Sequence, residues 1–347
     1  MRLSTPPTRS LLAGVIAALA LLTPCATPTS AAEVDGYTPG RGLALFENRL
    51  IIGGYLAMNL SLLDQTPDRF APEDLSLFVT WQPADHFKFF GEFEAEDAVV
   101  LDGSGLHTSH AGASLERLYA EWEPSDVLRL RLGKMLTPIG IWNLIHAAPL
   151  VWTVSRPLAT MDFFDTGVTG AVLDVTVLRG DDVDLVATAF GQATDQLDDT
   201  GAPHAFRRAA GGRLELSTTQ GPRAGLSYVR FDDRNDDHWE STFGCDFFWE
   251  TGRFELSAEA SVNDPSSGAT TWGAYTQLVY HPRWTLRLHP VARIEYVDLG
   301  TVERTPFVFG MAWKPSLGTI VKIEGIVGGD DTNLGGEGLL ASLAVLF

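Results

Sequence analysis

The sequence LERLYAEWEPSDVLRLRLGKMLTPIGIWN at Leu115–Asn143 contains two runs in which hydrophobic and polar residues alternate. In the first run the apolar positions are Leu118, Ala120 and Trp122, and in the second they are Leu128, Leu130 and Leu132. A period of two places such residues on one face of a β-strand. The residues EPSD at Glu123–Asp126 separate the runs as a tight turn, so the sequence predicts a hairpin with one apolar face.

The same alternation continues along the chain and predicts about 16 strands. They are expected at Leu50–Ser61, Leu75–Trp81, Phe87–Glu96, Leu115–Trp122, Val127–Lys134, Gly167–Leu178, Val183–Gly191, Gly211–Ser217, Ala224–Phe231, Ser241–Trp249, Phe254–Val262, Thr271–Tyr280, Thr285–Tyr296, Phe307–Lys314, Thr319–Val327 and Gly338–Phe347. Hydrophobic residues make up 45% of the chain, yet no run after Ala32 approaches the roughly 20 residues of a membrane helix. An α-helical membrane protein is therefore excluded.

The predicted connections alternate between short turns and longer loops. The sequences QPAD, EPSD, RGDD, TTQGP, ETG, HPR and KPS are short, whereas Asp97–Ser114, Met135–Thr166 and Gln192–Ala210 are long. An even number of strands with both ends on the short-turn side is typical of an outer-membrane β-barrel, with short periplasmic turns and longer outer loops. Because no water satisfies backbone groups inside hydrocarbon, a spanning sheet has to close on itself. We expect an all-β transmembrane antiparallel barrel.

Aromatic residues and the final strand support an outer-membrane location in a Gram-negative bacterium. Six aromatic residues lie at or beside the short turns, where amphipathic rings suit the membrane interface: Trp81, Trp122, Trp249, Tyr280, Trp284 and Trp313. The last run, GLLASLAVLF, ends at Phe347 and resembles the terminal strand of bacterial outer-membrane proteins, which serves as an assembly signal. The expected partners are outer-membrane lipid, lipopolysaccharide and the barrel-assembly machinery.

The N-terminal residues 1–32 have the features of a secretory signal peptide. Two arginines precede an apolar run at Leu11–Leu22, and small residues at Ser30–Ala32 provide a cleavage site. The barrel would then occupy residues 33–347, with Cys245 as its single cysteine, so no internal disulfide can form. The net charge of −19 argues against nucleic acid as a partner.

Strand parity predicts which charged side chains line the lumen. If the apolar residues of each strand face lipid, eight charged residues face inward: Lys88, Glu92, Glu94, Glu96, Arg117, Glu121, Arg129 and Arg131. Opposed arginines and glutamates could produce a transverse field across a water-filled pore, which would orient dipolar solutes. The alternative is cross-strand salt bridging inside a narrower, filled barrel.

The long segment near 135–166 is apolar for a surface loop and is expected to fold inward and form a constriction. Its candidate filter residues are Asn143, His146, Arg156 and Asp162. His146 would carry charge only in acidic surroundings. The alternative is an outer loop that packs against a neighbouring subunit.

The sequence GKMLTPIGIWN resembles the Gly-Lys-x-x-x-Pro-x-Gly motif of the phosphate-selective porin O and P family, through Gly133, Lys134, Pro138 and Gly140. The segments Asp74–Glu94 and Asp165–Asp174 also resemble the layout of that family, so the likeness covers most of the mature barrel. The resemblance implies a trimeric 16-stranded channel whose constriction is lined by basic residues. The chain departs from a phosphate-selective pattern because it lacks a clear ladder of inward Arg and Lys.

No cofactor, metal site or catalytic residue is predicted. The acidic loops at Asp232–Asp237 and Asp330–Asp331 do not have the spacing of a calcium loop, and motifs for zinc peptidases, serine hydrolases, phosphate loops and dinucleotide sites are absent. We expect a homotrimeric porin that passes small hydrophilic solutes or ions passively. The alternatives are a non-conducting structural or adhesive barrel and an outer-membrane hydrolase.

Overall fold

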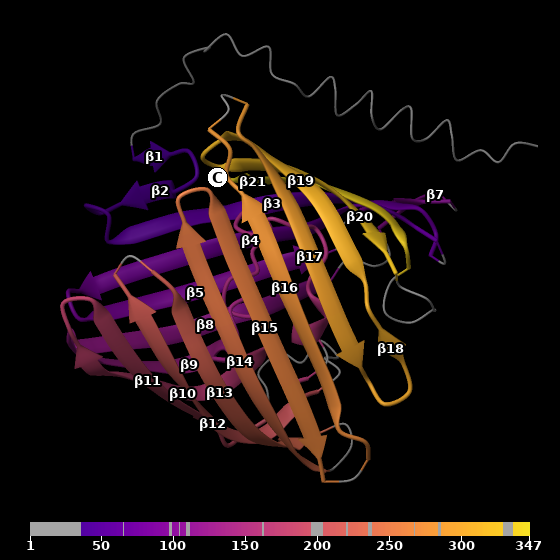
Figure 1. Cartoon of the computed structure of the whole chain (residues 1–347). Helices are drawn as coiled ribbons and strands as arrows, with labels where there is room; N and C mark the ends of the chain where they lie inside the picture. The colour runs from indigo at the N-terminus through magenta and orange to yellow at the C-terminus, as the bar shows by residue number, and fades with distance from the viewer. Residues whose placement is uncertain are drawn as a thin grey trace, which may run out of the picture. The chain divides into compact units, whose positions relative to one another are not determined.

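Sixteen long strands form the wall of a closed barrel in the described part of the chain (Figure 1). They are β3 (Leu50–Leu63), β4 (Arg69–Ala84), β5 (Phe87–Glu96), β8 (Gly112–Ser125), β9 (Leu128–Leu136), β10 (Gly167–Arg179), β11 (Val183–Gln192), β12 (Phe206–Thr218), β13 (Arg223–Asp233), β14 (Trp239–Thr251), β15 (Phe254–Pro265), β16 (Thr271–Tyr280), β17 (Leu288–Asp298), β19 (Phe307–Ser316), β20 (Thr319–Val327) and β21 (Gly338–Leu346). The predicted all-β barrel of about 16 strands is confirmed.

The computed structural model describes residues 36–347 except 65, 97–98, 104, 109–111, 162, 196–203, 220, 235–237, 267, 284–285 and 329–335. The side chains of residues 73 and 96 are also outside this description. The predicted signal peptide, residues 1–32, lies outside the described residues. Among the residues that are described, no helix has the length and apolar composition that crossing a membrane requires.

Pairing between β3 and β21 closes the barrel. Each long strand pairs antiparallel with the next, and β21 pairs with β3 from Gly338 opposite Leu63 to Leu346 opposite Tyr55. Beyond the last strand residue, the backbone of Phe347 exchanges hydrogen bonds of 2.9 and 3.0 Å with Gly54. Closure satisfies the backbone groups that would otherwise remain at two open sheet edges.

Short elements decorate the ends of the barrel. They are β2 (Gly42–Leu45), β6 (Val100–Asp102), β7 (Gly105–His107) and β18 (Glu303–Arg304). Two further short elements are β1 (Tyr37–Thr38), which pairs with β2, and the 3₁₀ turn η1 (Leu158–Thr160), which belongs to the connection between β9 and β10. Tight connections such as Gly252–Arg253 and Leu317–Gly318 gather at one end, on the left and upper left of Figure 1. The longest connection, residues 137–166, follows β9 at the other end. The expected alternation of short turns and longer loops is present.

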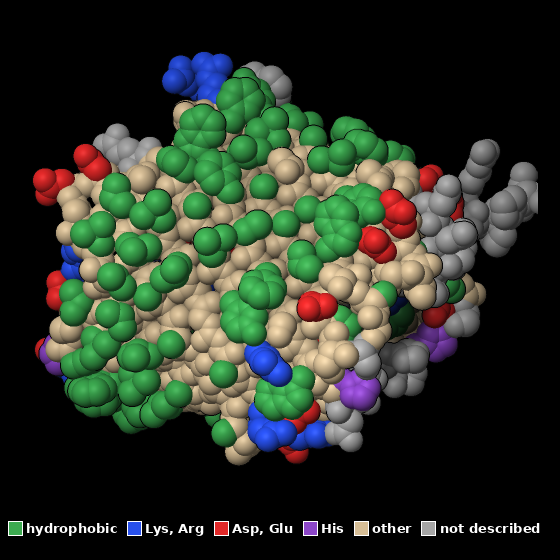
Figure 2. Space-filling model, turned by 60° about the horizontal axis from the view of Figure 1, so that its bottom comes forward, with side chains coloured by type: hydrophobic (Ala, Val, Ile, Leu, Met, Phe, Trp, Pro, Cys, Tyr) green, Lys and Arg blue, Asp and Glu red, His purple; other side chains and the backbone are tan. Residues whose placement is uncertain are grey.

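The outer face of the barrel is apolar. Leu118, Leu132, Phe243 and Phe309 are each at least 46% exposed, and the residues on either side of each of them in its strand are half-buried or buried. Figure 2 shows one such face, on which hydrophobic side chains are spread widely and charged ones are few. Burying this surface in lipid is favourable by roughly 25 cal/mol per Å². The fold therefore needs an apolar solvent around it.

Aromatic residues near the short turns pair across neighbouring strands. Three exposed tryptophans are Trp81, Trp122 and Trp249. Trp81 stacks on Phe89 with a centroid distance of 5.2 Å, and Trp122 stacks on Phe87 at 6.2 Å. Tyr280 lies 5.2 Å from the ring of Phe254. Trp313 is half-buried, and Trp284 lies outside the described residues.

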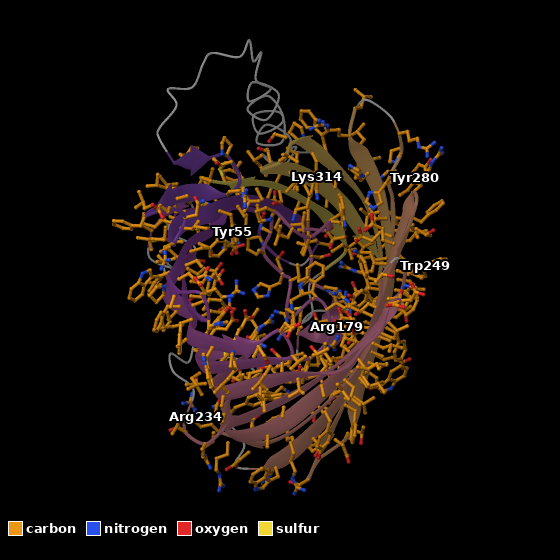
Figure 3. All side chains as sticks on the ribbon, turned by 90° about the vertical axis from the view of Figure 1, so that its left-hand side faces the viewer. Tyr55, Arg179, Arg234, Trp249, Tyr280 and Lys314 are labelled. Atoms are coloured by element: carbon orange, nitrogen blue, oxygen red, sulfur yellow. The ribbon has the colours of Figure 1, made fainter. Side chains whose placement is uncertain are left out.

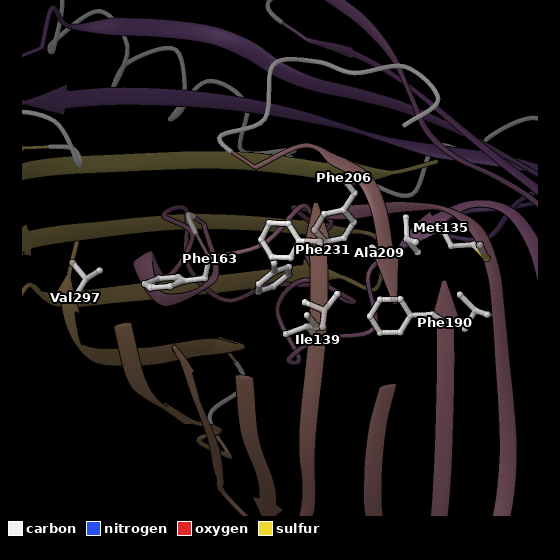
Figure 4. Packing of buried hydrophobic residues seen from close by; sticks show 12 residues of the cluster. Met135, Ile139, Phe163, Phe190, Phe206, Ala209, Phe231 and Val297 are labelled. Atoms are coloured by element: carbon white, nitrogen blue, oxygen red, sulfur yellow. The ribbon is translucent and has the colours of Figure 1, made fainter. Parts of the chain in front are cut away.

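A hydrophobic core fills one side of the interior. Figure 4 shows Phe163 and Ile139 of the 137–166 segment near Phe190 of β11 and Phe231 of β13. The other members of this buried cluster are Met135, Phe164, Val168, Val172, Phe206, Ala209, Val229 and Val297. Inward residues of β10 to β13 are thus apolar where the segment packs on them.

Candidate pore and the 137–166 loop

The two ends of the 137–166 loop are tied together by Asn143. Its amide nitrogen donates to the carbonyl oxygens of Thr137 at 2.8 Å and Thr166 at 3.1 Å, and the N–H of Thr137 also donates to Thr166. Asn143 is 0% exposed. Gly133, which precedes the loop, has φ +135° and lies so close to the carbonyl of Leu118 that a side chain would not fit.

Glu259 of β15 binds the first turn of the loop. Its carboxylate accepts hydrogen bonds from the backbone N–H groups of Ile141 at 2.8 Å and Trp142 at 2.9 Å. The hydroxyl of Tyr275 on β16 donates to the same carboxylate at 2.5 Å. Gly140 makes this approach possible, because it has φ +70° and a Cβ there would collide with the Glu259 carboxylate. Successive N–H groups that converge on one anion form a backbone nest.

Two further wall carboxylates bind the distal half of the loop. Glu324 of β20 accepts from the N–H groups of Val154 and Ser155, both at 2.8 Å, and Glu295 of β17 accepts from Leu158 at 2.6 Å. Both glutamates are at most 3% exposed. Since the loop starts at β9 and ends at β10, these contacts carry it to strands on another part of the wall.

Two buried cations bind the carbonyl side of the same loop. Lys322 of β20 donates to the carbonyl oxygens of Ala148 at 3.0 Å and Thr153 at 2.9 Å. Arg293 of β17 donates to Thr153 Oγ1 at 2.7 Å and to the Ser155 carbonyl at 3.0 Å. Buried backbone polar groups require partners. Acids of the wall satisfy N–H groups of the loop, and bases satisfy its carbonyl groups.

Trp152 fixes the loop near the short-turn end of the barrel. Its indole N–H donates to Glu255 at 2.8 Å, and its ring lies 5.1 Å from the His281 ring and 5.0 Å from the His289 ring. The ammonium group of Lys314 lies 3.7 Å from the centre of the indole ring, which is a cation–π contact. Figure 3 looks into the barrel from the short-turn side and labels Lys314 on this part of the wall.

Cavities lined by both polar and apolar residues lie on two sides of the loop. One of about 780 Å³ separates it from the wall at β3, β4, β20 and β21, and includes the side chains of His146, Arg156, Arg69, Asp74 and Ser342. The other, of about 420 Å³, is bounded by Pro138 and Leu144 of the loop and by charged residues of β9, β10 and β12, and reaches the short turn at Asp126. Open space therefore remains between the loop and the barrel wall on two sides of the loop.

The charged residues predicted to line the lumen form pairs between neighbouring strands. Lys88 pairs with Glu121, and Arg117 pairs with Glu92. Arg131 contacts Asp174 at 2.7 Å, Arg129 contacts Glu123 at 2.6 Å, and Glu94 accepts from Tyr55 at 3.1 Å and Ser76 at 3.0 Å. The side chain of Glu96 lies outside the described residues. These contacts have the cross-strand geometry that the sequence left as the alternative to charges opposed across the pore.

The predicted filter residues have different surroundings. Asn143 is buried at the base of the loop and does not line either cavity. His146 and Arg156 both line the larger cavity, and Arg156 donates to the Thr160 carbonyl at 2.6 Å and to Asn143 Oδ1 at 3.3 Å. Asp162 lies outside the described residues. Two of the four predicted filter residues, His146 and Arg156, therefore line the same cavity.

Burial controls two titratable groups of the loop. It lowers the pKa of His146, whose Nδ1–H donates to the Asn143 carbonyl at 3.0 Å, while the Glu116 carboxylate 3.6 Å from Nε2 opposes the shift. Burial raises the pKa of the Asp165 carboxyl to about 6, against the effect of hydrogen bonds from the N–H groups of Gly167 and Phe206. Both shifts favour the uncharged form of the group.

Sequence reasoning missed the wall residues that bind the loop: Glu259, Glu295, Glu324, Arg293 and Lys322. Strand parity was a usable signal for all five. In TIVKIEGIV at Thr319–Val327, for example, Lys322 and Glu324 alternate with apolar residues and so face inward.

Comparison with known proteins reveals the fold. No protein-family model and no curated protein matches this sequence. Among solved structures, OmpF of Salmonella typhi in a complex with daunomycin is similar with a TM-score of 0.62 and 11% identity, over 86% of this chain and 97% of that chain. An anion-selective porin from Comamonas acidovorans is similar with a TM-score of 0.53 and 12% identity, over 86% of this chain and 98% of that chain. The trimer form of OmpT from Vibrio cholerae is similar with a TM-score of 0.53 and 10% identity, over 86% of this chain and 99% of that chain.

The chain therefore has the fold of an outer-membrane porin. A closed barrel of sixteen strands with an apolar outer face satisfies its backbone internally and is stable in a bilayer. This architecture belongs to the outer membrane of Gram-negative bacteria.

Proposed function

We propose that this protein is a porin through which small hydrophilic solutes or ions diffuse passively. The observation that carries the proposal is the cavity of about 780 Å³ inside the barrel, between the 137–166 loop and the wall at β3, β4, β20 and β21. A barrel whose interior were filled by side chains would leave no space of this size. The proposed route passes beside the loop, which acts as the constriction.

The proposed mechanism is size exclusion modified by lumen charge. The loop is held from three sides by wall carboxylates and two wall cations, so the width of the passage is set by a fixed element. Arg156, His146 and Arg69 contribute basic groups to the passage, and Asp74 contributes an acidic one. Such a mixed lining alters ion preference without binding a solute tightly.

Phosphate selectivity is not part of the proposal, although the motif likeness to the phosphate-selective porin O and P family is retained as a hypothesis. Selective anion binding needs several basic groups with hydrogen bonds available for the ion. Arg117, Arg129 and Arg131 each contact a carboxylate of the wall. Their donors are therefore occupied in part by protein acids.

The test is conductance of the refolded protein in a planar bilayer, with the reversal potential measured under a salt gradient. We expect discrete steps of stable size. Arg156→Gln should move the reversal potential toward cation preference and Asp74→Asn toward anion preference, whereas Arg253→Gln in the β14–β15 turn should leave it unchanged. Folded protein without conductance would contradict the porin hypothesis and favour a structural or adhesive barrel.

A homotrimer is the assembly that we propose, supported by the trimer form of the similar Vibrio cholerae protein. Conductance steps that arrive in threes, and a complex of three chains by native mass spectrometry, would be expected. Contacts with lipopolysaccharide and recognition of the strand ending at Phe347 by the assembly machinery remain proposals of the same kind. The proposal involves no chemical step and no cofactor.

A further inference from the structure

Three polar side chains from separate segments meet near the outer end of β13. His204 precedes β12, Asp233 ends β13, and Glu240 lies at the start of β14. His204 Nδ1 lies 2.9 Å from Asp233 Oδ2 and 3.6 Å from Glu240 Oε2, and one donor atom of each residue falls within 4.8 Å of the others. In a tetrahedral zinc site with nitrogen and oxygen ligands, donor atoms lie about 3.4 Å apart. The distances from His204 Nδ1 to the two carboxylate oxygens are close to this value.

The carboxylates of this cluster are buried. Asp233 is 0% exposed and Glu240 is 5% exposed, and the His204 side chain is 17% exposed and packs edge-on against Phe231. Two carboxylates that approach one another in a buried site repel unless positive charge separates them. A divalent cation would neutralise the facing pair directly.

An amide oxygen supplies an independent indication of a ligand. Asn263 of β15 donates through Nδ2 to Glu240 Oε2 at 2.5 Å and is 3% exposed. Its Oδ1 is buried and has no hydrogen-bond partner among the residues that the structure describes. A buried oxygen without a hydrogen-bond donor is unfavourable. Rotation of the amide would exchange Oδ1 with Nδ2 and present an oxygen to this cluster, which becomes favourable when a cation is bound there.

We propose that His204, Asp233, Glu240 and Asn263 bind one divalent transition-metal ion of the zinc class. Imidazole nitrogen combined with carboxylate oxygen suits zinc, whereas calcium and magnesium favour sites built from oxygen alone. Binding requires Nδ1 of His204 to lose its proton, so the ion replaces the hydrogen bond to Asp233. The metal joins the segment before β12 to the ends of β13, β14 and β15, and fixes the outer rim of the barrel.

No motif in the sequence predicts this site, because its ligands lie between His204 and Asn263 and meet only in the folded barrel. The acidic residues at Asp232–Asp237 lack the spacing of a calcium loop, which is why no metal was expected. Of the described residues in that acidic run, Asp233 belongs to the cluster, and its partners come from β14 and from the segment before β12.

The test uses the refolded full chain, stripped with a chelator and titrated with Zn²⁺, with bound metal measured by elemental analysis after desalting. We expect one zinc per chain, and Co²⁺ in its place should give the visible absorption of a four-coordinate site. His204→Gln and Glu240→Gln should weaken binding by roughly 100-fold, and Asn263→Ala by roughly 10-fold. The matched control is His107→Gln, which alters a His–Asp pair between His107 of β7 and Asp102 of β6 with a separation of 3.3 Å.

Folding of each variant is checked by heat-modifiable migration on gels and by circular dichroism. Zinc binding by the wild type that falls in His204→Gln but not in His107→Gln supports the site. Absence of stoichiometric zinc in folded wild-type protein would overturn the proposal, as would equal affinity in the wild type and Glu240→Gln. Binding should also decline below pH 6, because the ligands must be deprotonated. Conductance is not required for either result, so the porin hypothesis is tested separately.

Discussion

Gly140 and Glu259 are separated by more than a hundred residues in sequence, yet the space that a side chain at Gly140 would need is occupied by the Glu259 carboxylate. The glycine turns the backbone at φ +70°, and the next two N–H groups then reach that carboxylate. One position thus determines how the 137–166 loop leaves the wall.

Gly140→Ala is expected to displace the first turn of the loop. The substitution adds strain of about 1–3 kcal/mol at a positive φ and pushes against Glu259. Single-channel recordings should show altered conductance and more frequent current fluctuations. The control is Gly112→Ala, where a Cβ meets nothing within 4 Å. Identical records for Gly140→Ala and the control would contradict this role.

Glu324→Ala should release the distal half of the loop. The change leaves the N–H groups of Val154 and Ser155 without their carboxylate, at about 1–3 kcal/mol each if no water replaces it. We expect larger conductance and passage of larger uncharged solutes in a liposome swelling assay. Glu324→Gln retains one acceptor and should have an intermediate effect, whereas Glu250→Gln in the exposed end of β14 should have none. If solute passage is unchanged in Glu324→Ala, the loop does not limit the pore.

His146 should make ion preference dependent on pH. Burial lowers its pKa from the ordinary value of 6.5, so the ring is neutral at pH 7 and gains charge only as the pH falls below that value. A new positive charge at the larger cavity should move the reversal potential toward anions in acid. His146→Gln should reduce this shift, and His86→Gln at a short turn should retain it. The same shift in both variants would assign the effect to other groups.

Asp165 should lower stability as the pH rises from about 4 to about 6. Its folded pKa of about 6 lies above the ordinary 3.8, so the folded state retains a proton that the unfolded state has lost in this window. The contribution is fully present below about pH 4 and is lost as pH passes 6, with a magnitude of order 3 kcal/mol. Urea unfolding at several pH values measures the slope.

The Asp165→Asn side chain cannot ionise, so the free energy of unfolding should depend less on pH between pH 4 and 6. The variant should be less stable overall, because its NH₂ group cannot accept a hydrogen bond from one of the two backbone N–H groups that Asp165 binds. Asp85→Asn, in an exposed turn, is the control and should preserve the wild-type slope. An unchanged slope in Asp165→Asn would assign the pH dependence elsewhere.

Alternation in the sequence was sufficient to predict the wall, and at β5, β16 and β20 the predicted bounds equal the observed ones. The prediction was short at the outer ends of β4 and β12, where β4 begins at Arg69 and β12 at Phe206. The β12 extension contains Arg207 and Arg208 and lacks an apolar alternate face. Apolar patterning is required only where a strand meets lipid, so it does not report how far a strand continues beyond the membrane.

The contacts of the loop could not be derived in the same way. Strand parity predicts that Glu259 and Glu324 face the interior of the barrel. It does not predict how far along the barrel axis they lie or which residues they contact, because both depend on the register of every strand pair between them and the loop. The bond from Ile141 to Glu259 joins residues 118 positions apart. Asn143 was chosen as a polar residue in an apolar loop, and its amide proved to bind the loop ends because buried carbonyl groups need donors.

The pairing of β3 with β21 also determines the order of events during folding. Every other long-strand pair joins neighbours in the chain and can form locally, whereas this seam joins residues nearly 300 positions apart. Until it forms, the sheet exposes two edges that can pair with other chains. Biogenesis must therefore keep the chain from aggregating until its last strand is delivered, and the slow step is expected to be the closure of this seam.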